Sequence, residues 1–120
     1  MVVRRWKLGV GGFIGEASVV EPSEDLEAFK RKRRRLLELT DVYVHPLRRG
    51  LGWAAALVRS AVQWVNSRGI DLVLRAQPYG PTADRNKRKF SKMQEAHLIE
   101  FYAGFGFRLC VRNVMVSRCA

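Results

Sequence analysis

The sequence has few cysteines and no long apolar segment, and each shortage excludes a class of protein. Its 120 residues include two cysteines, Cys110 and Cys119, too few and too poorly placed for a disulfide framework or a zinc site. No apolar run approaches the length that spans a bilayer, and residues 1–6 lack the apolar segment of a signal peptide. We therefore expect a single domain over residues 1–120 in the reducing cytoplasm, without membrane contact.

Acidic residues are also scarce relative to basic ones. The chain has 22 Lys and Arg against 11 Asp and Glu, which gives a net charge of +11. Much of this charge lies in the basic run Lys30–Arg35, and a second group lies within residues 85–92. Such runs bind nucleic acid or another polyanion, or they are solvated, mobile connectors. Aromatic residues do not interleave with these charges, which argues against a groove that stacks bases.

Hydrophobic patterning predicts a mixture of strands and helices. Strands are expected at residues 6–8, 13–20, 36–44, 70–75, 107–111 and 114–117. The clearest helix has one apolar stripe from Ala54 to Val65. A short helix is expected after Ser23, and a longer one after a capping box formed by Ser91 and Gln94. The strand–helix–strand unit over residues 36–75 predicts two parallel strands joined by a right-handed crossover.

The most informative segment joins the strand at 36–44 to the helix that follows. Gly50 and Gly52 lack a Cβ, so this turn can adopt positive φ and expose its N–H groups. The first turn of the helix adds unpaired donors and a partial positive charge. A turn of this kind is suited to a phosphate or pyrophosphate, although a purely structural glycine turn fits the same residues. The lysine of a P-loop and the third glycine of a dinucleotide fingerprint are missing.

Two segments together resemble a known family. Residues 44–54, Val-x-Pro-x-Arg-Arg-Gly-x-Gly-x-Ala, and the amphipathic helix after them resemble the acyl-CoA signature of the GNAT superfamily of N-acetyltransferases. Residues 101–107 resemble the family's Phe-Tyr-x-x-x-Gly-Phe segment, which precedes its last two strands. The similarity extends over roughly residues 13–118. Two motifs in the right order are far more specific than either motif alone.

The resemblance implies an α/β fold. Its mixed, mostly antiparallel sheet has a central parallel strand pair that splays to form a cleft, with helices on both faces. It also implies transfer of an acetyl or other short acyl group from acetyl-CoA to a primary amine, by direct attack on the thioester and without a metal. The amine belongs to a small molecule, a peptide or a protein, and homodimerisation stays open. The implied coenzyme-binding residues are Val42, Tyr43, Val44, Arg48, Arg49, Gly50, Leu51, Gly52, Trp53 and Ala54.

Catalytic candidates follow from the same resemblance and from strand geometry. Tyr102 matches the family tyrosine that protonates the leaving thiolate; a core aromatic residue is the alternative. Glu38, Asp41 and His45 are candidates for the general base. Glu38 and Asp41 are three residues apart on one strand, so they are expected on opposite faces, with only one of them in the cleft. Either carboxylate could instead pair with an arginine of the basic run. A backbone N–H near Val44 is expected to stabilise the oxyanion.

Three departures from the family pattern affect the site. Only about a dozen residues precede the strand at 13–20, where the family often has elements that shape the acceptor pocket, so that pocket would be open or completed by a partner subunit. Glu95 stands where the family often has an asparagine that contacts the coenzyme, and Lys30–Arg35 replaces a turn. The alternative function is a small basic protein that binds nucleic acid or another polyanion through this run, on a GNAT-like fold without catalysis.

Overall fold

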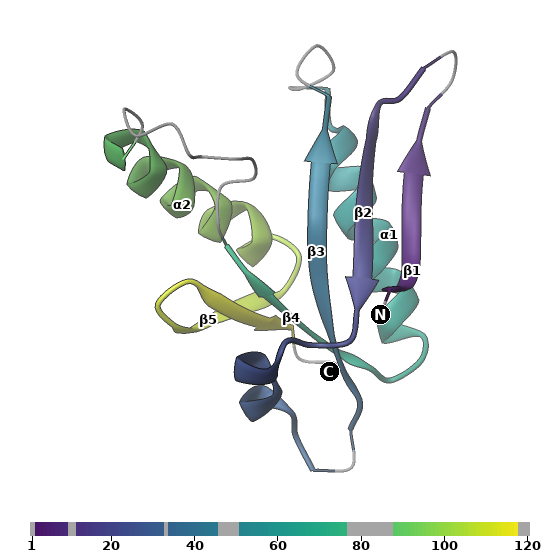
Figure 1. Cartoon of the computed structure of the whole chain (residues 1–120), viewed down its shortest axis with the longest axis vertical. Coiled ribbons are helices and arrows are strands. Elements are labelled where there is room, and N and C mark those ends of the chain that lie inside the picture. The colour runs from purple at the N-terminus through teal and green to yellow at the C-terminus, as the bar shows by residue number, and fades with distance from the viewer. Residues whose placement is uncertain (1, 10–11, 33, 46–50, 77–87, 118–120) are drawn as a thin grey trace.

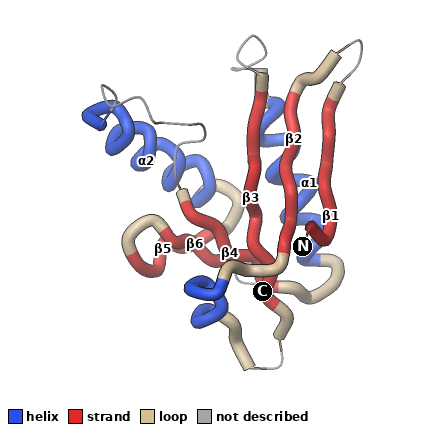
Figure 2. The backbone as a smooth tube through the Cα atoms, viewed as in Figure 1, coloured by secondary structure: helices blue, strands red, loops and turns tan. Residues whose placement is uncertain are grey.

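The computed structural model describes residues 2–9, 12–32, 34–45, 51–76 and 88–117, including their side chains except those of residues 88–94. The elements follow one another along the chain as shown in Figures 1 and 2. They are β1 (Val2–Leu8), β2 (Gly15–Val20), the 3-10 helix η1 (Glu24–Phe29), β3 (Leu36–Val44), α1 (Trp53–Asn66), β4 (Asp71–Arg75), α2 (Arg88–Ala103), β5 (Phe107–Val111) and β6 (Val114–Ser117). None of the described helices is long and apolar enough to cross a membrane.

The described strands form one six-stranded sheet with the order β1-β2-β3-β4-β6-β5. The central pair β3 and β4 is parallel, and the four other neighbouring pairs are antiparallel. The helix α1 connects the two parallel strands, as such a connection requires. The expected mixed, mostly antiparallel sheet with a central parallel pair is therefore confirmed.

The parallel pair separates after three residue pairs. β3 and β4 are in register from Leu36↔Asp71 to Glu38↔Val73, whereas the pairing of β3 with β2 continues to Gly15↔Val44. Figure 2 shows β4 turning away from β3 above this point. We call this divergence of β3 and β4 beyond Glu38 the splay.

The larger part of the core lies between the sheet and the two α-helices. Every second residue of the central strands points into this core. Leu37 and Leu39 of β3 belong to the core, as do Leu72 and Leu74 of β4. The helix α1 contributes Leu57, Val58, Ala61 and Val65, all at most 2% exposed. Each buried Leu or Val side chain stabilises the fold by about 1.5–3 kcal/mol. The apolar stripe predicted for this helix is therefore the surface that packs on the sheet.

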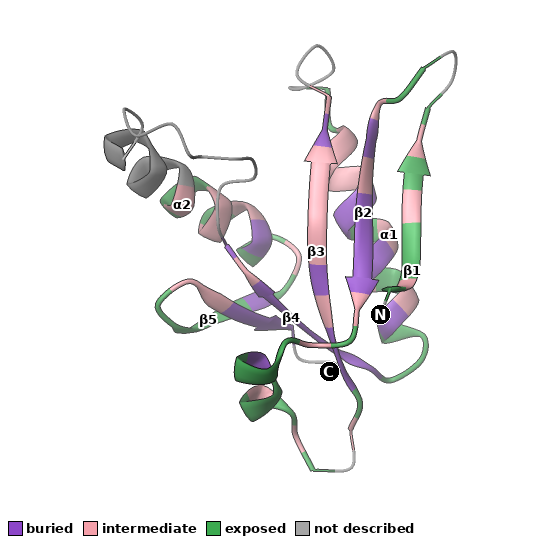
Figure 3. Ribbon diagram, in the orientation of Figure 1, coloured by how far each residue is buried: buried purple, intermediate pink, exposed green. Residues whose placement is uncertain are grey.

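The opposite face of the sheet is covered at one end. There Leu26 of η1 packs with Leu36, Val73 and Val116 in a second, smaller cluster. Helices thus lie on both faces, but α1 and α2 share one of them. In the part of the chain that the structure describes, no helix covers the upper half of β1, β2 and β3 on the η1 side, which faces the viewer in Figures 1 and 3. We call this surface the open face.

One helix start differs from the prediction, and a second helix starts where predicted but without its side-chain cap. The helix α2 begins at Arg88, so Ser91 lies inside the helix and the predicted capping box is wrong; the residues before Ser91 have adequate helix propensity and do not stop it. Ser23 is the N-cap residue of η1, but its side chain makes no capping hydrogen bond. Its hydroxyl donates instead to Glu38 Oε1 at 3.0 Å.

Candidate active site

The start of α1 borders the splay. Gly52, the N-cap residue, has a φ of +84°, the left-handed conformation that glycine adopts without strain. Its carbonyl accepts the N–H of Ala56 at 3.1 Å and so begins the helix. The first turn has neither a side-chain cap nor an acidic residue, so nothing on the helix offsets its positive end. Arg48, Arg49 and Gly50, expected in this turn, lie outside the described residues.

The two residues after Gly52 are half-buried and pack against the main core. The indole Nε1 of Trp53 is buried and has no hydrogen-bond partner among the described residues. Leaving such a donor unsatisfied costs about 1–3 kcal/mol. Trp53 therefore places an unsatisfied N–H donor beside the first turn of α1. Leu51, on the other side of Gly52, is 66% exposed.

A bulge interrupts β3 inside the splay. The register of β2 and β3 shifts between Glu16↔Tyr43 and Ser18↔Thr40, so β3 contains one extra residue. Asp41 lies at this point with a φ of +55°. Aspartate tolerates the left-handed region better than most residues, but the conformation still costs about 1–3 kcal/mol and such strain is concentrated at functional sites.

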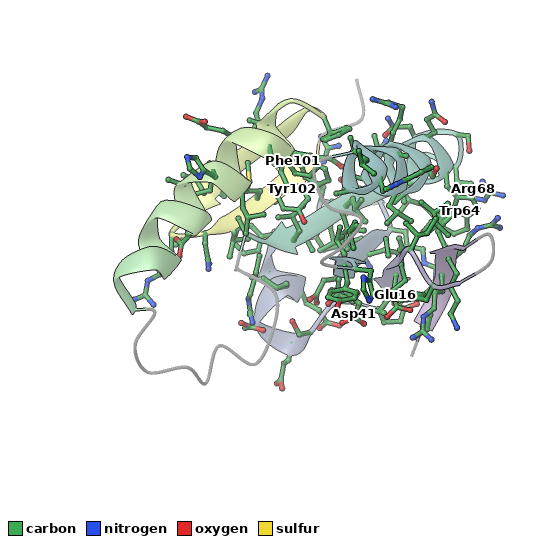
Figure 4. The ribbon with its side chains drawn as sticks, turned by 90° about the horizontal axis from the view of Figure 1, so that it is seen from above. Glu16, Asp41, Trp64, Arg68, Phe101 and Tyr102 are labelled. Atoms are coloured by element: carbon green, nitrogen blue, oxygen red, sulfur yellow. The ribbon has the colours of Figure 1, made fainter. Side chains whose placement is uncertain are left out.

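The bulge overturns the predicted faces of two candidate bases. Glu38 Oε1 accepts hydrogen bonds from the backbone N–H and the hydroxyl of Ser23, at 2.9 and 3.0 Å, which places it on the η1 side of the sheet. Figure 4 shows Asp41 on this same side, opposite α1. The extra residue shifts the alternation, so Val42 and Val44 point to the main core instead. Glu38 and Asp41 therefore share a face, and the expectation that they lie on opposite faces is wrong.

The three candidate bases differ in their surroundings. Asp41 lies in the splayed part of β3, whereas Glu38 occupies the last position paired with β4 and is held by Ser23. His45 extends the pairing of β2 and β3, because its backbone N–H donates to the Ile14 carbonyl at 2.6 Å. Asp41 is thus the candidate whose position depends on the splay and the bulge together.

Tyr102 lies in the last turn of α2, on the helix side of the sheet (Figure 4). Its ring packs edge-on against Phe101 and Phe107, with centroids 5.2 and 5.9 Å away. The residue is 7% exposed, and this burial raises the pKa of its hydroxyl to about 12. Tyr102 is thus a core aromatic residue that keeps its proton at neutral pH, so the core and proton-donor interpretations are compatible.

The described residues contain no group of three or more His, Cys, Asp or Glu side chains that could hold a metal ion.

The sequence itself matches the Acetyltransferase (GNAT) family over residues 6–107. The chain belongs to this family. A comparison with curated proteins gives no significant match.

Solved structures of N-acetyltransferases share the fold of this GNAT domain at low sequence identity. The Bacillus subtilis N-acetyltransferase YlbP, in complex with coenzyme A, has a TM-score of 0.57 and 15% identity over 95% of this chain and 66% of its own. An aminoglycoside 6'-N-acetyltransferase complexed with coenzyme A has a TM-score of 0.61 and 16% identity, over 97% of this chain and 73% of its own.

The Escherichia coli GNAT protein YhbS, also in complex with coenzyme A, has a TM-score of 0.50 and 21% identity over 92% of this chain. This chain spans 54% of YhbS and 66% of YlbP, so it matches about half to two thirds of their length.

The basic run of this GNAT domain is tied to the fold, which the sequence did not reveal. Arg31 donates from Nε and Nη2 to the two carboxylate oxygens of Asp71 at 2.8 and 2.9 Å, and Arg34 Nε donates at 3.2 Å. Asp71 is 1% exposed. Arg35 pairs with Glu21 at 2.8 Å. For these three arginines, the interpretation as a solvated, mobile connector is wrong.

The electrostatics of Asp71 explain why two arginines are needed. Burial by itself raises the pKa of Asp71, but the hydrogen bonds and charges of Arg31 and Arg34 outweigh it, so the net pKa lies below the usual 3.8. A carboxylate buried without such partners is strongly unfavourable. An acidic residue at the start of an otherwise apolar strand was the signal that could have revealed this cluster.

Proposed function

We propose that this GNAT domain transfers an acetyl or other short acyl group from acyl-CoA, with acetyl-CoA as the donor, to a primary amine. The observation that carries the proposal is the splay. β3 and β4 part after Glu38↔Val73, and the part of β3 beyond this pair leads directly to the turn before α1. Coenzyme A in the complexes of YlbP and the aminoglycoside acetyltransferase supports this choice of donor.

The coenzyme would bind through its pyrophosphate at the start of α1. There the left-handed Gly52 and the uncapped first turn favour an anion, and the net charge of +11 attracts one. Arg48, Arg49, Gly50 and Leu51 would complete the phosphate turn, with Trp53 and Ala54 behind it. The pantetheine arm would follow the splayed edge of β3 at Val42, Tyr43 and Val44.

The bound thioester supplies an activated acyl carbon. The neutral amine nitrogen forms the C–N bond as the C–S bond breaks; the amine gives up one proton and the thiolate takes one. Asp41 is proposed to accept the first proton and Tyr102 to donate the second. They lie on opposite faces of the sheet (Figure 4), so the two proton transfers take place on opposite sides of the acyl carbon. The backbone at Val44 is proposed to stabilise charge on the carbonyl oxygen.

We also propose a cytoplasmic location, where the exposed thiol of Cys110 stays reduced. The ion pairs of the basic run weaken the alternative that this run binds a polyanion. Arg31, Arg34 and Arg35, three of the cations of the basic run, are engaged by Asp71 and Glu21. These arginines would have to leave those carboxylates before they could bind phosphates.

Incubation with acetyl-CoA and a panel of primary amines tests the proposal. Free thiol is followed against a control without amine, and the acetylated amine is identified by mass spectrometry. We expect amine-dependent thiol release with one amide formed per thiol. Thiol release that does not depend on amine, or no product with any amine, would contradict acetyl transfer.

A further inference from the structure

An aromatic pair lies beside the splay on the open face. The rings of Phe13 and Tyr43 are stacked, with centroids 6.1 Å apart and an interplanar angle of 12°. Phe13 is 47% exposed. Tyr43 lies between Val42 and Val44, which face the main core, so its side chain lies on the opposite side of the strand. The pair therefore places two stacked aromatic rings on the open face, and the ring of Phe13 is about half exposed there.

Two carboxylates flank this aromatic pair. Glu16 is the direct cross-strand partner of Tyr43 and shares its face. Asp41 lies two residues before Tyr43, and Figure 4 shows both carboxylates on the side of the sheet away from α1. Neither carboxylate forms a hydrogen bond or an ion pair with another described residue.

Among the described residues, cations on this face lie on both sides of the two carboxylates. Lys7 is the exposed cross-strand partner of Glu16 on β1. Arg5 lies further along β1 and donates from Nε to the Ser18 hydroxyl at 3.0 Å. On the β3 side of Glu16 the described surface carries Tyr43 and Asp41, and across the splay Arg75 of β4 faces the same side and pairs with Asp25 of η1. Because Asp25 already engages Arg75, Glu16 and Asp41 are the carboxylates beside the bulge that have no ion-pair partner among the described residues.

We propose that Phe13, Tyr43 and Glu16 bind the acceptor, and that the acceptor carries a second ammonium group beyond the reacting amine, as a linear alkyl diamine does. This inference rests on the proposed acetyl transfer. The reacting nitrogen lies at the bulge near Asp41, and the distal ammonium lies against the aromatic pair and Glu16. Aromatic faces and carboxylates both attract an alkylammonium group. A neutral or acidic acceptor would lack this attraction to the aromatic pair and Glu16.

A matched pair of acceptors tests the inference: 1,5-diaminopentane and pentylamine have the same chain length and differ in the second ammonium. The kcat/KM of each is measured for the parent, for Glu16→Gln and for Phe13→Leu. Glu24→Gln, at the start of the distant η1, is the control because it makes the same change in net charge. We expect the parent to prefer the diamine about tenfold. Both test variants should lose most of this preference because KM rises several-fold more for the diamine than for pentylamine, whereas the Glu24→Gln variant should keep the parental kinetics with both amines.

Equal use of the two amines by the parent would overturn this inference while leaving acetyl transfer intact. A loss that is equal for both amines in Glu16→Gln would also overturn it, since charge recognition predicts a selective loss. If Phe13→Leu alters sedimentation of the protein but not acceptor preference, the aromatic pair belongs to a contact between two copies. Absence of thiol release with every amine would instead contradict the proposed function itself, and this inference with it.

Discussion

At the scale of single residues, the burial of Tyr102 raises the pKa of its hydroxyl and so determines how it can act as a proton donor. Its pKa of about 12 keeps the hydroxyl protonated at any physiological pH. An ordinary thiol has a pKa of about 8.5, so complete transfer from Tyr102 to a thiolate is uphill by about 3.5 pKa units. Its catalytic contribution is therefore expected in the transition state, where the hydroxyl stabilises the negative charge that develops on the departing sulfur.

The variant Tyr102→Phe tests this role. It keeps the ring that packs against Phe101 and Phe107 and deletes only the oxygen, so stability should change little. We expect kcat to fall about 10²-fold, while the Kd for acetyl-CoA, measured by calorimetry, stays within a few-fold. This combination identifies an interaction made only in the transition state. Equal kcat in parent and variant would leave Tyr102 as a packing residue.

The same tyrosine should be visible in alkaline unfolding. Its pKa is raised from 10.0 to about 12 in the folded protein, so the folded state holds the proton more tightly than the unfolded state. The resulting stability is complete below pH 10 and is lost as the pH rises towards 12. We expect the free energy of unfolding of the parent to fall more steeply between these pH values than that of Tyr102→Phe. Parallel curves for the two proteins would contradict a raised pKa.

Two substitutions of Gly52 separate the effect of backbone strain from the effect of contact with the coenzyme. A Cβ built at Gly52 meets no atom of the described residues within 4 Å, but its φ of +84° strains any β-branched residue. Asparagine tolerates this conformation, so Gly52→Asn should keep near-parental stability while its side chain crowds the proposed pyrophosphate. We expect acetyl-CoA affinity to fall at least tenfold in Gly52→Asn, and Gly52→Val to lose stability as well. Unchanged affinity in a folded Gly52→Asn would exclude this turn as the coenzyme site.

At the scale of elements, the basic run anchors the start of β4. Asp71→Asn removes the carboxylate that Arg31 and Arg34 share. Breaking a fully buried pair costs about 3–5 kcal/mol; we expect about 2 kcal/mol, because these arginines are 36% and 31% exposed and can rehydrate. Arg35→Gln is the control, because its pair with Glu21 is about half exposed and contributes at most about 1 kcal/mol. If chemical denaturation shows the same loss of unfolding free energy in Asp71→Asn and Arg35→Gln, the basic run does not anchor β4 through Asp71.

The pH dependence of this anchor has a definite sign. The pKa of Asp71 is lowered in the folded protein, so its charged form contributes stability above the unfolded pKa of 3.8, and this stability disappears as the pH falls further. The free energy of unfolding of the parent should therefore decrease below about pH 4. Asp71→Asn should lack this part of the decrease when both are unfolded by denaturant at a series of acidic pH values.

Elements with a strong local signal were predictable from the sequence, and the bulge was not. The bounds of β3 were predicted as Leu36–Val44 because apolar and β-branched residues fill it and Pro46 follows. Nothing local to Asp41 marks an extra residue, since a bulge is defined by the partner strand. Asp71 at the start of an apolar strand indicated that a cationic partner was needed, but that this partner is Arg31, 40 residues away, follows only from the fold.

At the scale of the whole molecule, the net charge of +11 makes two kinds of anion binding possible. Binding to DNA depends on counterion release, so a contact with about six phosphates loses roughly 10³ in affinity between 50 and 200 mM salt. A coenzyme held by a helix end and a shaped turn depends less on ionic strength. We expect the affinity for acetyl-CoA to fall less than about tenfold over this range, measured by calorimetry beside a DNA duplex. Matching salt dependence for both ligands would favour the polyanion-binding alternative.

A crystal structure of the protein with coenzyme A tests the proposed site most directly. We predict the pyrophosphate at the first turn of α1 beside Gly52, the pantetheine arm along β3 beyond Glu38, and the thiol between Asp41 and Tyr102. Coenzyme bound instead over the basic run, or away from the splay of β3 and β4, would contradict the proposed site and the acetyl transfer inferred from it.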